Sequence, residues 1–374
     1  MIETGRRAHH RCGGRHDRSG LGNSVRCDHH GSGCDGGDSC PPADQLRADP
    51  GRPVTFSGAS RSKNSVKYAV LFPGQGSQRV GMGAELFESR PDLLIGAADR
   101  ILGWSLRDVC LQGPEARLTA TEHAQPALYA LAWTLWAELN DRLGHPPAAA
   151  AGHSLGEYTA LAAAGVLSFE EGLELVAVRA RAMAEAVGRE PSGMAVVLGV
   201  ADDRVEEVAA DRRSAGGRLW VANLNAPGQV VLAGTLDDID WLVTNQRRLG
   251  LRRVVRLKVA GAFHTPLMDP AVPRLQAALR AVGMGDPAFS VWSNVTASPI
   301  TPGEEGCLLA RQLVAPVRFA ASLKSIAASG VGTFVHVGPG DVTAGMAKRT
   351  VRGSRILVVS SIPQAGEAAT FLAV

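Results

Sequence analysis

A serine flanked by glycines is the first feature of this sequence that could carry out chemistry. Residues 148–151 are four alanines, a short apolar run typical of a buried strand, and residues 157–164 are rich in helix formers. Between them, GHSLG at 152–156 matches G-x-S-x-G, in which a tight strand-to-helix turn exposes the serine hydroxyl. The pattern predicts that Ser154 is a nucleophile at a helix N-terminus, where N–H groups stabilise an oxyanion. A chance turn rich in glycine and serine is the alternative.

A serine hydroxyl is a poor nucleophile at neutral pH and needs a general base, most often a histidine. Five of the ten histidines lie in residues 1–65, and the others are His123, His145, His153, His264 and His336. We expect His264 to be the base, because it follows the last strand of a predicted insert and lies at a domain junction. The aspartates between Ser154 and His264 fit a solvated helix N-terminus, so no acidic third member is evident. A backbone carbonyl could hold the imidazole tautomer instead.

The other four histidines outside residues 1–65 have weaker contexts. His145 lies in a proline-rich turn, His123 lies in a loop-like stretch, and His336 lies in an apolar strand that we expect in the core. His153 adjoins the serine, but neighbouring side chains on a tight turn point apart. We therefore expect His153 to have a supporting role.

Length and composition indicate a large globular enzyme. The 374 residues exceed one ordinary domain, and the apolar (45%) and charged (20%) fractions are typical of soluble enzymes. The formal net charge is +3, and residues 1–65 hold ten Lys/Arg against seven Asp/Glu, so the rest of the chain is neutral. We therefore expect no nucleic-acid partner for the folded part. No run of about 18 apolar residues occurs, so we expect no membrane span. We also expect a cytoplasmic protein.

The first 65 residues differ from the rest of the chain. They hold 11 of the 43 glycines and four of the six cysteines, and they lack both apolar periodicity and the hydrophobic region of a secretory signal. The spacing of their cysteines and histidines matches no zinc-binding pattern, so we expect no metal site. We interpret residues 1–65 as a disordered tail or as the product of a mis-assigned start codon.

The remaining chain alternates strands with helices, which predicts an α/β fold with a mostly parallel sheet covered on both faces. Strands are expected at 68–72, 148–151, 289–293, 333–337 and 356–359, and helices include 84–110, 124–143 and 270–282. Within 191–259 the order is βαββαβ, ending in a strand at 251–259, which predicts an inserted ferredoxin-like subdomain. The large domain then comprises 66–190 and 260–374. A crevice between the two lobes is the expected ligand site.

Blocks along the ordered chain resemble the malonyl-CoA:acyl carrier protein transacylase family and, more broadly, the acyltransferase domains of fatty acid and polyketide synthases. The blocks are FPGQGSQ at 72–78, GM at 81–82, TEHAQPAL at 121–128, GHSLGEY at 152–158, RARAM at 179–183, NAPGQVVLAG at 225–234, GAFHTPLM at 261–268, APVRF at 315–319 and VGPG at 337–340. Each block alone is a modest signal, but the ordered set is specific and spans about 66–360. The resemblance implies a hydrolase-like α/β domain with a ferredoxin-like subdomain.

The resemblance also implies roles for the reacting groups. Ser154 would be the acyl nucleophile, and His264 would be its general base and later its general acid. The backbone carbonyl of Gln312 matches the position that orients the histidine in the family. The N–H groups of Gln75 and Leu155 would form the oxyanion hole.

Substrate selection is implied by a second set of residues. Arg179 falls on the family's R-x-x-x-M position and would bind the free carboxylate of a malonyl group through a bidentate pair; without that context it reads as a surface helix arginine. Gln125 and Asn225 match positions that line the pocket, although ordinary polar loop residues are an equal alternative. Phe263 should crowd a 2-methyl branch and so favours malonyl over methylmalonyl.

The expected function is ping-pong transfer of a malonyl group from malonyl-CoA to the phosphopantetheine thiol of an acyl carrier protein, through a malonyl-serine ester. We expect CoA thioester and carrier protein as partners, no bound cofactor, and a monomer. Fatty acid and polyketide pathways both remain open. The alternatives are an acyl hydrolase that clears stalled thioesters, a transferase for a 2-substituted malonyl unit, and a non-catalytic docking partner.

Overall fold

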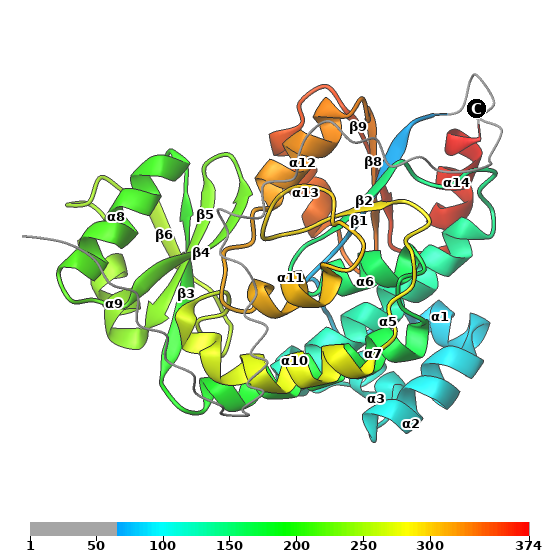
Figure 1. Ribbon diagram of the computed structural model, residues 1–374, viewed down its shortest axis with the longest axis horizontal. Helices are drawn as coiled ribbons and strands as arrows, with labels where there is room; N and C mark the ends of the chain where they lie inside the picture. The colour runs from blue at the N-terminus through cyan, green and yellow to red at the C-terminus, as the bar shows by residue number, and fades with distance from the viewer. Residues whose placement is uncertain (1–65, 374) are drawn as a thin grey trace, which may run out of the picture. The chain divides into compact units, whose positions relative to one another are not determined.

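Two β-sheets organise the chain in the computed structural model, which describes residues 66–373 (Figure 1). One sheet has five parallel strands and the other has four antiparallel strands. This confirms the predicted α/β class with a parallel sheet and a separate antiparallel sheet. The interpretation of residues 1–65 as a tail or a mis-assigned start lies outside the described residues.

The parallel sheet has the strand order β7-β2-β1-β8-β9. Its strands are β1 (Tyr68–Phe72), β2 (Ala149–Gly152), β7 (Ser290–Trp292), β8 (Thr333–Val337) and β9 (Arg355–Val359). The central strand β1 is buried along its whole length and pairs with β2 in a register that sets Phe72 opposite Gly152. Since parallel strands end at the same edge, the loops after β1 and β2 are neighbours.

Helices cover both faces of this sheet, because successive side chains of a strand point to opposite faces. Tyr68, Val70 and Phe72 face the cluster formed with helices α5 (Thr121–Asn140), α6 (Gly156–Ala163), α7 (Phe169–Val187) and α14 (Ile362–Leu372). Ala69 and Leu71 face α12 (Phe319–Ala328) and α13 (Val342–Thr350). The sheet is therefore a rigid base for the loops at its carboxyl edge.

The antiparallel sheet has the order β4-β5-β3-β6. Its elements are β3 (Ser192–Leu198), α8 (Asp202–Ser214), β4 (Leu219–Ala226), β5 (Gln229–Thr235), α9 (Leu236–Asn245) and β6 (Arg253–Arg256). Helices α8 and α9 pack on one face through buried aliphatic side chains (Figure 1, left). The last strand is shorter than the predicted 251–259, because its register with β3 covers Arg253–Arg256.

The other face and one edge of the antiparallel sheet contact the large domain. Met194, Val196 and Ala233 belong to the main hydrophobic cluster that also contains β1. At the edge, the Leu224 N–H donates to the Val317 carbonyl at 2.8 Å, and the Val317 N–H donates to the Ala222 carbonyl at 2.9 Å. These contacts fix β4 against the segment that leads into α12.

Two helix predictions were wrong in detail. The predicted helix at 84–110 is divided into α1 (Ala84–Ser89), a π-helix (Asp92–Ala97), α2 (Ala98–Leu102) and α3 (Leu106–Leu111), with Gly103 at positive φ ending α2. The predicted helix at 124–143 begins at Thr121, so His123 lies in a helix rather than in a loop. Pro126 lies inside α5 and removes one backbone hydrogen bond. The burial of most of this helix stabilises it by more than that loss.

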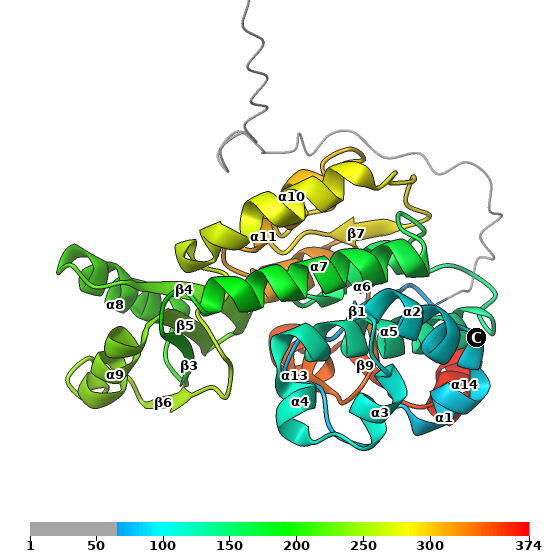
Figure 2. The ribbon, with the colours of Figure 1, turned by 90° about the horizontal axis from the view of Figure 1, so that it is seen from below.

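The remaining helices complete the large domain. They are α4 (Glu115–Thr119), a 3₁₀ helix at Pro266–Ala271, α10 (Val272–Ala281) and α11 (Glu305–Gln312). Figure 2 shows α10 lying along α7, in agreement with the contacts between these two helices. Between residues 66 and 373, no helix is both long enough and apolar enough to cross a membrane.

Candidate active site

Ser154 lies at a tight turn between β2 and α6, with a φ of 52° that residues other than glycine rarely adopt. The flanking glycines allow this turn. A Cβ on Gly152 would lie 1.8 Å from the carbonyl carbon of Gly156, and a Cβ on Gly156 would lie 2.3 Å from the Phe72 carbonyl oxygen. The close packing therefore requires glycine at both positions, and it holds the serine over the edge of the sheet.

His264 lies within hydrogen-bond distance of the serine. Its Nε2 is 2.7 Å from Ser154 Oγ, and its Nδ1 is 2.7 Å from the Gln312 carbonyl oxygen. Because a carbonyl only accepts, Nδ1 carries the proton and Nε2 is free to take the serine proton. The structure thus brings together Ser154, His264 and the Gln312 backbone, as the sequence predicts.

The surroundings of His264 keep its imidazole neutral. Burial and, to a smaller extent, the positive charge of Arg179 lower the pKa of His264 to about 3, against the opposing effect of the Gln312 carbonyl. A neutral imidazole is the form that accepts a proton. The base is therefore in its active form at neutral pH.

Arg179 lies on α7 with its side chain fully buried against the nucleophile. Its guanidinium donates to Ser154 Oγ at 3.0 Å, to Gln312 Oε1 at 3.0 Å and to Gln125 Oε1 at 2.6 Å. The guanidinium carbon also lies 5.5 Å from the centre of the Tyr158 ring. Within residues 66–373, no carboxylate forms an ion pair with Arg179, and its Nε has no hydrogen-bond partner. A buried cation with neutral partners favours an anionic ligand beside the serine.

The predicted oxyanion donors lie at the two neighbouring strand ends. Gln75 follows β1, and Leu155 follows the serine at the start of α6, while Phe72 and Gly152 pair in the sheet. Neither backbone N–H of Gln75 or Leu155 donates to another group in the described part of the chain. Both are thus available as donors, and their role as an oxyanion hole stays a prediction.

The three predicted pocket residues have different surroundings. Gln125 contacts Arg179 and also the Met183 sulfur, at 3.5 Å from Nε2. The Asn225 Oδ1 accepts from His153 Nε2 at 2.7 Å, so Asn225 holds the histidine next to the serine. This contact agrees with the supporting role expected for His153. Phe263 is buried in the main cluster directly before His264.

Two further side chains of the site were not predicted. Asn294, which follows β7, accepts from the Ser154 N–H and donates to the Gly152 carbonyl, both at 2.7 Å. Glu157 is fully buried on α6 and accepts from the Gln312 amide at 2.6 Å. Glu157 could have been noticed, because it is the one charged residue of α6. No local sequence signal identifies Asn294, since it reaches the turn from 140 residues away.

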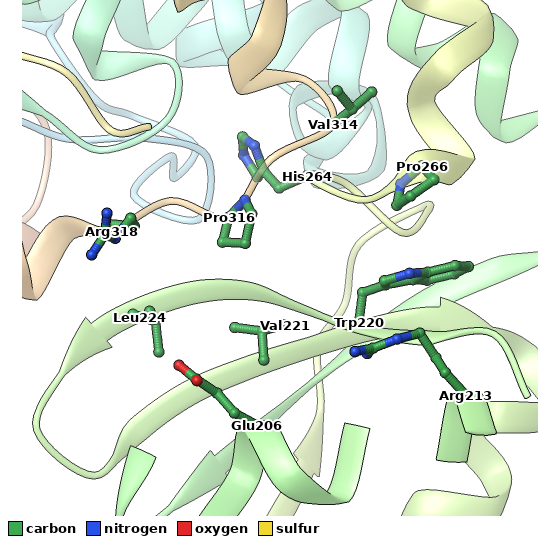
Figure 3. Close-up of a pocket in the computed structure, with 10 residues that line it drawn as sticks. All are labelled: Glu206, Arg213, Trp220, Val221, Leu224, His264, Pro266, Val314, Pro316 and Arg318. Carbon is green, nitrogen blue, oxygen red and sulfur yellow. The ribbon is translucent and has the colours of Figure 1, made fainter. Parts of the chain in front are cut away.

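A cleft of about 510 Å³ opens beside His264 (Figure 3). One wall carries His264, Pro266, Val314, Pro316 and Arg318, and the opposite wall carries Glu206, Arg213, Trp220, Val221 and Leu224 from the antiparallel sheet and α8. The lining is mixed apolar and polar, and its one reacting group is His264, which is within hydrogen-bond distance of Ser154. Over residues 66–373, no group of three or more His, Cys, Asp or Glu side chains could hold a metal ion.

Comparison with known proteins agrees with this geometry. Residues 70–373 match the family described as the acyl transferase domain. A malonyl CoA-acyl carrier protein transacylase of Bacillus subtilis (strain 168) is 38% identical over 299 residues, which cover 79% of this chain and 93% of the relative.

Solved structures give the same result. The malonyl CoA-acyl carrier protein transacylase of Coxiella burnetii is similar with a TM-score of 0.79 and 32% identity, over 83% of this chain and 99% of that one. A malonyl-transacylase solved in complex with its type II PKS acyl-carrier protein is similar with a TM-score of 0.77 and 34% identity, over 82% of this chain and 99% of that one.

Proposed function

The chain belongs to the acyl transferase domain family, and from this premise we propose that it transfers a malonyl group from malonyl-CoA to the phosphopantetheine thiol of an acyl carrier protein. Its relatives named as malonyl CoA-acyl carrier protein transacylases support this substrate pair. The observation that carries the proposal is the placement of a buried Arg179 guanidinium 3.0 Å from Ser154 Oγ, with no carboxylate partner in the described residues.

The first half-reaction forms the malonyl-serine ester. His264 Nε2 takes the proton of Ser154 as the serine Oγ attacks the thioester carbonyl carbon of malonyl-CoA. The Gln75 and Leu155 N–H groups would then donate to the oxyanion, an effect of about 3 kcal/mol for each donor. The C–S bond breaks, and the CoA thiolate leaves with the proton that His264 returns.

The second half-reaction repeats these steps with the carrier protein. His264 takes the proton of the phosphopantetheine thiol, and the thiolate sulfur attacks the ester carbonyl of malonyl-Ser154. The C–O bond to the serine breaks, and Ser154 Oγ recovers its proton from His264. The Gln312 carbonyl keeps the proton on His264 Nδ1 throughout, so that Nε2 serves both halves.

Arg179 selects the acyl group in this proposal. One of its terminal nitrogens donates to Ser154 Oγ and the other to Gln125 Oε1, and a malonyl carboxylate that replaced these contacts could form a bidentate pair. A neutral acetyl group would leave the buried guanidinium without an anionic partner. The bulk of Phe263 next to His264 favours malonyl over a 2-substituted malonyl unit, which remains the alternative substrate.

The substrates would reach the serine through the cleft beside His264. The complex of the related malonyl-transacylase with its acyl-carrier protein supports a carrier protein as partner. The proposal includes a monomer that needs no resident cofactor. It also includes a cytoplasmic location, because the acyl donor is a CoA thioester.

Intact-mass analysis of the acylated enzyme tests the proposal. Mixed with equal malonyl-CoA, methylmalonyl-CoA and acetyl-CoA, the enzyme should gain the mass of malonyl, and the Ser154→Ala variant should gain none. Purified carrier protein should then remove the malonyl group from the enzyme. Acylation by acetyl but not malonyl, with release to water, would support the acyl hydrolase instead.

A further inference from the structure

The buried carboxyl group of Glu157 has no part in the steps described above. It lies at the start of α6, three residues after the nucleophile, with no exposed surface. Its Oε2 accepts from Gln312 Nε2 at 2.6 Å and from the Asn294 N–H at 3.1 Å, while its Oε1 has no partner in the described part of the chain. Burial of a carboxyl group costs free energy, so its position calls for a compensating role.

Gln312 connects Glu157 to all three reacting groups. The Gln312 Nε2 also donates to the Ser154 carbonyl at 3.0 Å, its Oε1 accepts from Arg179, and its backbone carbonyl accepts from His264. An amide has distinct donor and acceptor ends. If it rotated by half a turn, its NH₂ would face the Arg179 donors, and its oxygen would face the Glu157 carboxylate. The carboxylate and the Ser154 carbonyl therefore select the orientation that suits Arg179.

Glu157 also acts on the turn through Asn294. The Asn294 backbone donates to Glu157, and the Asn294 side chain bridges Gly152 and Ser154. One carboxyl group thus contacts the two residues that hold the nucleophile and the guanidinium in place.

We propose that Glu157 is a positioning residue for acyl transfer, which acts through the Gln312 amide to set the place of the Arg179 guanidinium beside Ser154. The inference rests on the proposed function. Glu157 interacts with the Arg179 charge, yet neither of its oxygens bonds to the guanidinium, so the place of a substrate carboxylate at Arg179 is not taken. Burial raises the pKa of Glu157 to about 7, against the lowering effects of Gln312, Asn294 and Arg179. The buried Tyr158 hydroxyl also interacts electrostatically with Arg179 and Glu157.

A double-mutant cycle between Glu157 and Gln312 tests the inference. Glu157→Ala should lower kcat/KM for serine malonylation about 100-fold, because small misplacements of a binding group have effects of this size. Glu157→Gln keeps an acceptor for the Gln312 amide and should recover most of the loss. Gln312→Ala keeps the carbonyl that orients His264. In that background, Glu157→Ala should change kcat/KM no more than about 3-fold, since coupled residues are not additive.

Two further readouts separate positioning from general stability. Acetyl transfer does not need the guanidinium, so the preference for malonyl over acetyl should fall in Glu157→Ala. Thr159→Val is the matched control, because Thr159 is also buried on α6 with an unpartnered hydroxyl but lies outside the network. This variant should keep wild-type kcat/KM and wild-type substrate preference. If Glu157→Ala does not fold, the same cycle is measured with Glu157→Leu, which fills the space but removes the acceptor for the Gln312 amide.

The inference is overturned if the fold-losses in kcat/KM of Glu157→Ala and Gln312→Ala are independent, so that the double variant shows their product. It is equally overturned if Glu157→Ala matches Thr159→Val in kcat/KM and in malonyl preference. Failure of the wild-type enzyme to transfer malonyl in the same assay would instead refute the proposed function. The two failures are therefore distinguishable.

Discussion

Ser154 and His264 both have left-handed backbone conformations, with φ of 52° and 60°. Such conformations cost about 1–3 kcal/mol each and persist where surrounding contacts fix them. At Ser154 these contacts are the Asn294 side chain and the turn packed under Phe72. In these conformations Oγ and Nε2 lie 2.7 Å apart, so the geometry for proton transfer exists before substrate arrives.

Replacement of Arg179 should invert the acyl preference. In Arg179→Gln, kcat/KM for malonylation of Ser154 should fall about 10- to 100-fold, which corresponds to one hydrogen bond to a charged group. The rate with acetyl-CoA should stay equal or rise, because no buried cation is left without its anion. Single-turnover acylation with each CoA ester measures both values. An equal loss with both substrates would mean that Arg179 supports the fold rather than the selection.

The pH profile of acylation should reveal the low pKa of His264. The base is active when neutral, so wild-type kcat/KM with acetyl-CoA should stay constant from about pH 8 down to about pH 5. In Arg179→Gln one cause of the low pKa of His264 is removed, and the pKa should rise toward its ordinary value. The acid limb should therefore move to higher pH. A limb that stays in place or moves lower would contradict this electrostatic coupling.

At the scale of elements, the turn between β2 and α6 depends on backbone contact rather than on side chains. Gly156→Ala should lower the free energy of unfolding by more than about 4 kcal/mol, because its Cβ would meet the Phe72 and Pro73 backbone, which cannot move away cheaply. Gly345→Ala on α13 is the control, since nothing lies within 4 Å of its Cβ, and it should gain about 0.5–1 kcal/mol. Urea unfolding measures both. Equal stability of the two variants would refute the packing argument.

The elements that were predicted well are those with local signals. The strand, the glycines and the helix formers around Ser154 occur within one short stretch, and the alternation of strands and helices indicated the inserted antiparallel sheet. The breaks within 84–111 were missed although two of them have local signals: Pro91 disfavours helix at Arg90, and Gly103 ends α2 at positive φ. The positions of Asn294 and of the Gln312 side chain depend on contacts across the sheet, and no local pattern encodes them.

At the scale of the whole described chain, the reacting groups come from segments far apart in sequence that only the packed fold unites. The cleft has one wall from the antiparallel sheet and one from the large domain, and the hydrogen bonds of Val317 with Ala222 and Leu224 join the two walls. The packing that stabilises the fold therefore also holds the reacting groups together. Several buried groups of the site, such as His264 and Glu157, have altered pKa values.

The two buried histidines and the buried Glu157 change the stability of the protein with pH in opposite directions. Burial lowers the pKa of His264 to about 3 and the pKa of His336 to about 4. The stability that these histidines contribute is therefore fully present above their ordinary pKa of 6.5 and is lost as pH falls toward the lowered values. Burial raises the pKa of Glu157 from 4.5 to about 7. The stability that Glu157 contributes is fully present below pH 4.5 and is lost as pH rises through about 7.

The stability of Glu157→Gln relative to wild type should therefore depend on pH. Glutamine does not titrate, so the variant lacks the loss that wild type suffers between pH 4.5 and about pH 7, where Glu157 is ionised in the unfolded chain but still protonated in the folded protein. The difference in Tm, variant minus wild type, should become more positive over this range, whatever its value at the acid end. Both histidines are present in both proteins, so their effects cancel in the difference. Thermal melts at matched ionic strength measure it, and a difference that is flat or falls with pH would show that Glu157 does not titrate there.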